Sequence, residues 1–213
     1  LGRQALKANT TANFNVAVGA EALGTNTTGA ENTAIGYNAL GANTTGSPNV
    51  AVGGNALADN TTGGSLVAIG REALANNTTA HDNVAVGKHS LRLNTTGAEN
   101  TAVGKDALNN NTTGGQNSAL GTDALQANTT GIRNTAVGWN ALLNNTTAQG
   151  NTAVGAYAGD SNTTGENNTF VGYDTAPTNT TGQKNSTLGS GALHQNTTAE
   201  RNTAVGFQAG YYT

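Results

Sequence analysis

The chain has no cysteine and no methionine, and only two prolines and one tryptophan among its 213 residues. The absence of cysteine excludes a disulfide framework and a thiolate metal site. Aromatic residues make up 4% of the chain, so it lacks the large side chains that fill the core of a conventional globular domain. Charged residues make up 10%, against roughly 25% in typical soluble domains. This composition is typical of a repetitive or fibrous protein.

The sequence also lacks a charge excess and a long apolar run. The net charge of -3 gives no basic surface for nucleic acid or anionic lipid, so neither is expected as a partner. No apolar run reaches the ~18 to 20 residues that span a bilayer, and no signal peptide is visible. Because the chain opens at Leu1 without any methionine, we expect it to be a segment of a longer polypeptide.

What the chain does have is a period of 17 residues without insertion or deletion. The unit reads N-T-A-V-G-x-x-A-L-x-x-N-T-T-G-x-x, and we number its positions 1 to 17. A partial unit covers 1–14, eleven full units cover 15–201, and a second partial unit covers 202–213. We therefore predict one uninterrupted repeat array over 1–213, without a linker or domain boundary.

Several positions of the unit hold one type of residue throughout. Position 4 is always Val, Ile or Leu, position 3 and position 8 are almost always Ala, and position 9 is almost always Leu. The exceptions are Phe170 and Thr187 at position 3, Ser90 and Thr175 at position 8, and Gly159, Ala176 and Gly210 at position 9.

Position 5 is glycine in all thirteen occurrences, which fits a positive φ or a close approach of neighbouring backbone. We expect a structural glycine column made of Gly2, Gly19, Gly36, Gly53, Gly70, Gly87, Gly104, Gly121, Gly138, Gly155, Gly172, Gly189 and Gly206.

Charged residues and histidines fall only at positions 6, 7, 10, 11, 16 and 17. Three exposed corners thus separate three inward-looking segments, N-T-A-V-G, A-L and N-T-T-G, which is the pattern of one coil of a β-solenoid. Helical repeats fit poorly, because each unit would place Gly, Asn and paired Thr inside helices.

We therefore predict an all-β fold, a β-solenoid (β-roll or β-helix) of about 12.5 coils with 17 residues per coil. Coils stacked at ~4.8 Å would form a rod roughly 60 Å long, in which Asn and Thr side chains hydrogen-bond along their columns. Because side chains alternate along a strand, Ala at position 3 and Val at position 4 cannot both face the interior. One column fills the coil, and we expect the other to pack against neighbouring copies of the chain.

Two stretches show a resemblance to known repeats: N-T-A-V-G-W-N-A-L at 134–142 and N-T-A-V-G-A-Y-A-G at 151–159. They resemble the head repeats of trimeric autotransporter adhesins, and still more the repetitive shafts of tail-fibre-like proteins of phages and bacteria. The resemblance covers the whole chain and implies a parallel homotrimeric fibre at a cell or virion surface. The chain departs from the adhesin head in its longer, 17-residue unit, and it shows no chaperone or anchor segment.

No catalytic or metal-binding constellation is evident. The three histidines, His81, His89 and His194, lie in different units at corner positions, and we interpret them as surface residues. Stacked charges such as Lys88 and Lys105 at position 6 beside His89 and Asp106 at position 7 predict an exposed mixed-charge face. The calcium-binding nonapeptide pattern and a phosphate-binding glycine loop are both missing, so no cofactor is expected.

The N-T-T triplet matches the acceptor pattern for N-glycosylation. It also keeps Thr in the middle position of all twelve copies, from Thr10 to Thr197, although a sequon leaves that position free. We therefore favour a structural ladder and keep covalent glycans as the alternative. The twelve candidate acceptors are Asn9, Asn26, Asn43, Asn60, Asn77, Asn94, Asn111, Asn128, Asn145, Asn162, Asn179 and Asn196.

Aromatic residues at corners could stack on sugars or on partner proteins. The packing interpretation is favoured, in which Tyr157 and Phe207 cover the Ala-Leu column where Gly159 and Gly210 replace leucine. Ice binding is disfavoured because the paired threonines are adjacent, so only one per coil can face a given side.

The favoured function is a non-enzymatic shaft or stalk segment of an extracellular, cell-surface or virion-surface fibre. Its expected partners are copies of itself, with a trimer favoured, and a cell-surface or carbohydrate receptor. A glycosylated extracellular filament is the alternative, and a carbohydrate- or ice-binding solenoid is the third interpretation.

Overall fold

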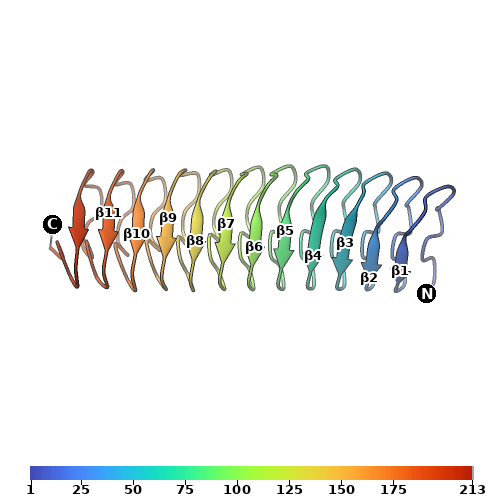
Figure 1. Cartoon of the computed structure of the whole chain (residues 1–213), viewed down its shortest axis with the longest axis horizontal. Helices are drawn as coiled ribbons and strands as arrows, with labels where there is room; N and C mark the ends of the chain where they lie inside the picture. Colours follow the sequence, from blue (N-terminus) through green and yellow to red (C-terminus); the bar gives the residue numbers. More distant parts are fainter. Residues whose placement is uncertain (213) are drawn as a thin grey trace.

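The computed structural model describes residues 1–212 and shows a parallel β-solenoid drawn out as a rod (Figure 1). Twelve short strands lie side by side in sequence order and form one sheet along the rod. The strands are β1 (Val16–Val18), β2 (Thr33–Ile35), β3 (Asn49–Val52), β4 (Leu66–Ile69), β5 (Val84–Val86), β6 (Thr101–Val103), β7 (Ser118–Leu120), β8 (Thr135–Val137), β9 (Thr152–Val154), β10 (Thr169–Val171), β11 (Ser186–Leu188) and β12 (Thr203–Val205).

Every strand pairs with the next in register, so that each residue lies beside the residue 17 positions later. Ala102 of β6, for example, pairs with Ala119 of β7, and Ala119 pairs with Ala136 of β8. The predicted all-β solenoid with 17 residues per coil is thereby confirmed, with about eleven turns between the first and the last strand. The partial unit 1–14 contributes no strand.

Each of the three inward-looking segments expected in a coil buries side chains, as Ala102, Leu108 and Asn111 do, but only the first segment is a strand. The strand covers positions 2 to 4, and also position 1 in β3 and β4, while most of the remaining coil consists of turns and bends. The backbone there still bonds to the next coil: the Leu108 amide donates to the Ala124 carbonyl at 3.0 Å, and the Thr112 amide to the Thr129 carbonyl at 2.9 Å. Parallel stacking therefore satisfies the backbone without further strands.

The leucine of the A-L segment has a left-handed backbone, which explains why this segment is a turn. Leu108 has φ 51°, although its side chain is completely buried. A non-glycine residue in this conformation costs about 1 kcal/mol or more. Positions 7 and 17 are left-handed as well, as at Asp106 (φ 55°) and Glu99 (φ 60°). Three such residues per coil bend the chain back to the start of the next strand.

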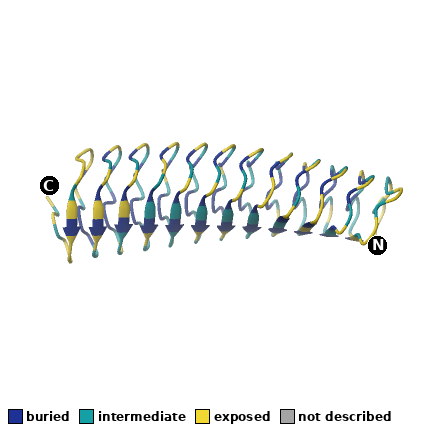
Figure 2. Ribbon diagram, turned by 45° about the horizontal axis from the view of Figure 1, so that its top comes forward, coloured by how far each residue is buried: buried dark blue, intermediate teal, exposed yellow. Residues whose placement is uncertain are grey.

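The structure settles which column faces inward. In β6, Ala102 is completely buried, while Thr101 is half-buried and Val103 is 38% exposed. The same alternation recurs along the sheet, where the buried residue at position 3 of each strand lies between half-buried or exposed residues (Figure 2). Alanine at position 3 therefore fills the coil with the Ala-Leu pair of positions 8 and 9, and the Thr and Val columns form an outer face.

Residues that differ from the consensus at the buried positions 3, 8 and 9 compensate for one another in volume or in hydrogen bonding. A Cβ added to Gly159 would overlap the ring of Phe170, so this ring fills the space that a leucine occupies elsewhere. Tyr157 does not have that role, and our sequence interpretation is corrected on this point. Thr175 and Thr187, two further departures, share a buried hydrogen bond of 2.9 Å between their hydroxyl oxygens.

The glycine column brings successive coils into close backbone contact. Gly53 has φ 135°, and a Cβ there would lie 2.5 Å from the carbonyl oxygen of Gly70 in the next coil. Both the conformation and the space therefore restrict position 5 to glycine. The next residue, Gly54, has no heavy atom within 4 Å of such a Cβ.

Replacing Gly53 by alanine is expected to destabilise the array by more than about 2 kcal/mol, because the residue would be strained and would push two coils apart. Gly54→Ala is the matched control, since its added methyl group meets open space. Thermal unfolding followed by circular dichroism measures both variants. Equal midpoints for the two would contradict the close contact between coils.

Candidate functional surfaces

The asparagines of N-T-T form a buried ladder rather than a surface row. Asn111 is completely buried, and its Nδ2 donates at 2.8 Å to Oδ1 of Asn94 in the preceding coil and at 2.9 Å to the Gly114 carbonyl. Its own Oδ1 accepts a hydrogen bond of 2.8 Å from Asn128. The buried amide thus uses both of its donors and its acceptor, which a polar group in a core requires.

A second asparagine ladder, at position 1, was not recognised in the sequence. Asn100 Nδ2 donates at 2.9 Å to the same Gly114 carbonyl, and its Oδ1 accepts the Asn117 amide at 3.0 Å. The signal was present, since position 1 is Asn in every full unit but the one that starts at Leu66. The position-15 carbonyl thus links the two ladders across the coil.

The two threonines of the triplet differ in exposure, as their adjacency predicts. Thr112 is half-buried, and its hydroxyl donates to the Thr129 carbonyl of the next coil at 3.0 Å. Thr113 is exposed, and position 14 is exposed in all twelve copies. The constant middle threonine therefore belongs to a hydrogen-bonded column.

These contacts bear on the candidate glycosylation sites. A glycan replaces one hydrogen of Nδ2, but ten of the twelve acceptors are completely buried, and Asn196 is 1% exposed. Asn9, in the first partial unit, is half-buried, and its Nδ2 donates to the Ala12 carbonyl at 3.1 Å. At the buried positions a glycan is compatible only with an opened coil.

Asn111→Ala is expected to lower the stability of the array by about 1 to 3 kcal/mol, because it leaves the buried Oδ1 of Asn94 and one donor of Asn128 unpaired. Asn110→Ala is the matched control, because the neighbouring side chain is exposed at a corner. The measurement is chemical unfolding at neutral pH. A loss of the same size in both variants would contradict the ladder.

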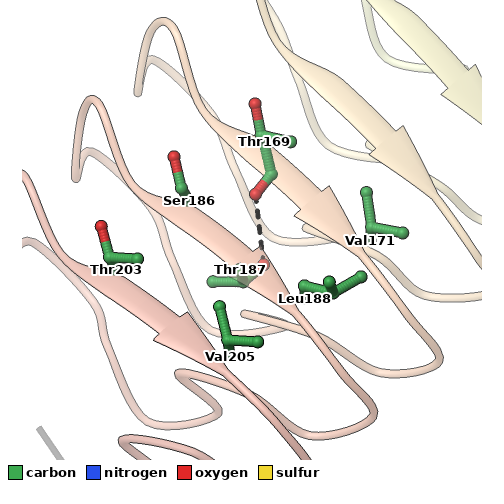
Figure 3. A pocket seen from close by; sticks show the side chains of 7 residues that line it. All are labelled: Thr169, Val171, Ser186, Thr187, Leu188, Thr203 and Val205. Atoms are coloured by element: carbon green, nitrogen blue, oxygen red, sulfur yellow. Dashed lines mark hydrogen bonds between the residues drawn. The ribbon is translucent and has the colours of Figure 1, made fainter.

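The outer face of the sheet, which we call the sheet face, consists of positions 2 and 4 of all twelve strands. It carries no charged residue along its whole length. Its position-4 side chains are strongly exposed for apolar residues, as with Val18 at 41%, Ile69 at 40% and Leu120 at 42%. Figure 3 shows where it is hollowed: Thr169, Val171, Leu188 and Val205 help to line a shallow apolar depression of about 230 Å³ across β10 to β12.

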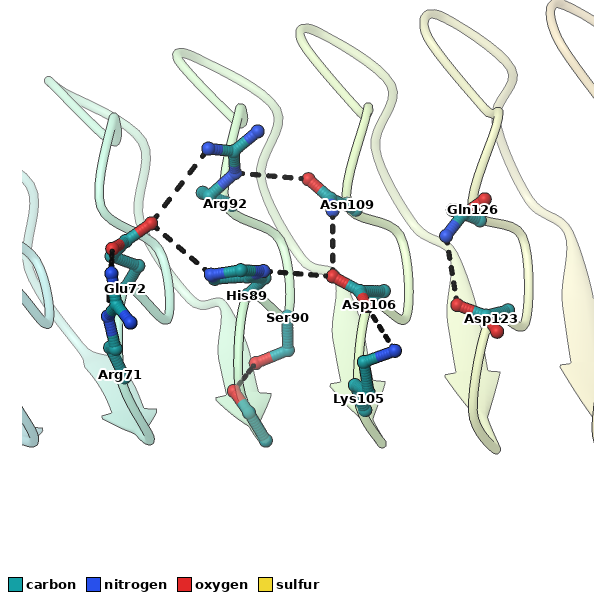
Figure 4. Close-up of polar contacts among 11 residues, drawn as sticks. Arg71, Glu72, His89, Ser90, Arg92, Lys105, Asp106, Asn109, Asp123 and Gln126 are labelled. Atoms are coloured by element: carbon teal, nitrogen blue, oxygen red, sulfur yellow. Dashed lines mark hydrogen bonds and ion pairs between the residues drawn. The ribbon is translucent and has the colours of Figure 1, made fainter.

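The corner after the strand, at positions 6, 7 and 10, carries a second surface, which we call the corner face. In the middle of the array it holds a network of charges (Figure 4). His89 bridges two coils, with Nε2 3.3 Å from Glu72 and Nδ1 3.1 Å from Asp106. Lys105 lies 3.1 Å from the other oxygen of Asp106. The exposed mixed-charge face expected from the sequence is thus only partly right, because Asp106 is buried and His89 is half-buried.

Competing effects set the protonation of Asp106. Burial alone would raise the pKa of this carboxyl, but hydrogen bonds from Lys105 and His89, together with their charges, outweigh burial and hold the pKa below its ordinary value of 3.8. The hydrogen bond with Asp106 in turn raises the pKa of Lys105. Asp106 is therefore ionised at neutral pH.

Because its pKa is lowered by folding, the Asp106 carboxylate contributes stability above pH 3.8, and this contribution is lost as the pH falls through the lower pKa of the folded state. Asp106→Asn is expected to cost about 1 kcal/mol at pH 7 and almost nothing near pH 2. The control is Asp123→Asn in the next coil, where the carboxylate accepts a hydrogen bond from Gln126. Thermal midpoints across pH test this, and a pH-independent loss would contradict it.

The corner face changes character in the last coils, where aromatic rings replace the charges. The rings of Trp139 and Tyr157 lie 4.8 Å apart, and those of Tyr157 and Tyr173 lie 6.2 Å apart. Beyond them, His194 stacks on Tyr211 at 4.6 Å. Trp139 is 51% exposed and Tyr173 is 59% exposed, so these rings do not serve the core.

The three histidines lie apart, as predicted, but each is close to an acidic side chain. His81 is 2.7 Å from Asp82, His89 bridges Glu72 and Asp106, and His194 is 3.3 Å from Asp174. Among the described residues, no group of three or more His, Cys, Asp or Glu is placed to hold a metal ion. Nor does 1–212 contain a helix of the length and hydropathy needed to cross a membrane.

No family model, no curated protein and no solved structure matches the chain.

Proposed function

We propose that the chain is a non-enzymatic shaft segment of an extracellular or virion-surface fibre, assembled from parallel copies with a trimer favoured. The observation that carries this proposal is the sheet face, an exposed and uncharged surface that runs unbroken beside a regular ladder of coils. Contiguous exposed apolar surfaces of this kind mark sites of protein association. The resemblance to adhesin and tail-fibre repeats supports the location outside the cell.

The size of the sheet face supports association between copies. Twelve strands at ~4.8 Å spacing, each about three residues of ~3.3 Å long, give a face of roughly 600 Å² per copy. Two such faces together bury roughly 1,100 Å², which reaches the lower limit of specific protein interfaces. Because the repeat never shifts register, identical columns can meet along the full length.

Charges along the two edges of the face are compatible with a parallel arrangement. At the level of β5, Asp82 precedes the strand and Lys88 follows it, and at the level of β6, Glu99 precedes and Lys105 follows. In a cyclic assembly with all sheet faces toward a common axis, the edge of one copy that precedes its strands lies beside the edge of the neighbouring copy that follows its strands. Opposite charges then lie at the same level, which favours pairing in register.

The mechanism of such a shaft is mechanical. Backbone hydrogen bonds, two asparagine ladders and the glycine column join each coil to the next, so the rod resists bending and stretching. The corners tolerate variation because they lie outside these ladders, and they display the residues that a receptor can contact.

Light scattering on the folded chain tests the proposal, and the expected mass is that of three copies. Val86→Lys and Val137→Lys place charges in the middle of the sheet face and are expected to give monomers, because a buried unpaired charge opposes association. Thr113→Lys is the control, since this exposed threonine lies outside the sheet face. A monomeric mass for the unchanged chain, with circular dichroism showing a folded array, would overturn the proposal.

A further inference from the structure

The aromatic residues of the corner face gather at one end of the array. Of the nine aromatic residues in the chain, seven lie from residue 139 onward. We define the aromatic ridge as Trp139, Tyr157, Tyr173, Asp174, His194 and Tyr211. Its first three rings come from three successive coils and form a continuous row of ring contacts.

Polar groups join the two halves of the ridge. Asp174 follows Tyr173 directly, and its carboxylate lies 3.3 Å from Nε2 of His194, which stacks on Tyr211. Nδ1 of His194 is buried and has no hydrogen-bond partner among residues 1–212. Asp160 lies nearby, and burial together with the charge of Asp174 raises its pKa, while hydrogen bonds from Ser161 oppose the rise. Hydrogen-bonding groups therefore lie between the row of three rings and the ring of Tyr211.

The fold does not require these rings. In the four coils before the ridge, position 7, where Tyr157 lies, holds Glu72, His89, Asp106 and Asp123, and position 6, where Trp139 and Tyr173 lie, holds Arg71, Lys88, Lys105 and Thr122. The same coil closes around the same Ala-Leu core. The gap at Gly159 is filled from inside by Phe170. Half-exposed Trp and Tyr side chains leave apolar area in water, which is unfavourable unless a partner covers it.

We propose that the aromatic ridge binds an oligosaccharide. The rings stack on the C–H faces of successive sugar units, and the carboxylate of Asp174 accepts hydrogen bonds from their hydroxyl groups. Because neighbouring ring planes are inclined by 59° and 88°, the ring faces point in several directions. They can therefore contact the oligosaccharide from more than one side. The core of a protein interface is depleted in Asp, so a carboxylate between the rings favours a sugar over a protein partner.

This inference goes beyond the shaft proposal and does not depend on it, because the ridge lies at the corner and its rings come from a single chain. Trp139 is the only tryptophan, so its fluorescence reports directly on the ridge. Tyr37 provides an internal control, because it occupies the same unit position as Trp139 and Tyr173 and is 57% exposed. It closely follows β2, which lies far along the rod from β8 to β11 (Figure 1).

The experiment is a glycan array probed with the full chain, followed by fluorescence titration with oligomers of glucose, galactose and N-acetylglucosamine. The expected result is a saturable change in Trp139 emission, with at least about tenfold weaker binding for Tyr173→Ala and for Asp174→Asn. Tyr37→Ala should bind as the unchanged chain does. Circular dichroism and light scattering on each variant confirm that folding and association are unchanged, so that failure of the shaft proposal would be recognised separately.

Three results would overturn the inference. The first is no binding on the array or in the titrations. The second is an equal loss of binding in Tyr37→Ala, which would place any sugar contact outside the ridge. The third is a protein partner that covers the ridge while no saccharide binds.

Discussion

Register between coils is the constraint on which the rest of the structure depends. Each strand pairs with the one 17 residues later, and amides in the turns bond to the same neighbours. Every coil must therefore have the same length and the same backbone path, because one extra residue would misalign all later ladders. The buried columns carry no charge because they have no route to water, whereas the sheet face is uncharged although it is exposed.

The interior is partly polar, and this distinguishes it from an ordinary core. Alanine and leucine fill the space behind the sheet, while two columns of asparagine satisfy one another and the position-15 carbonyl. Buried amides are stable here only because identical neighbours supply partners at a constant spacing. The left-handed leucines are also stabilised by their surroundings. The backbone conformation of each costs about 1 kcal/mol, and the complete burial of its large side chain offsets this cost.

The sequence was sufficient to predict the solenoid, its period and its charged corners, because these depend on columns that can be compared within one chain. Alternation alone left open whether Ala102 or Val103 faces the interior, since neither column carries charge. The left-handed turn at Leu108 could not be foreseen, because leucine has no preference for that conformation. Compensation between Gly159 and Phe170 was hidden as well, since the two residues belong to different columns and meet only in space. The aromatic ridge was likewise hidden in the sequence, because residues at three unit positions contribute to it and meet only in the folded chain.

Strict register also allows the length of the rod to change by the duplication or loss of whole 17-residue units. Any one unit can be duplicated or lost without a mismatch, since the coils on either side of the junction present the same ladders. Each such event changes the reach of the rod by one strand spacing, ~4.8 Å, and leaves its cross-section unaltered. A unit gained or lost before residue 139 would change the distance between the first coils and the aromatic ridge without any change in the chemistry of the ridge.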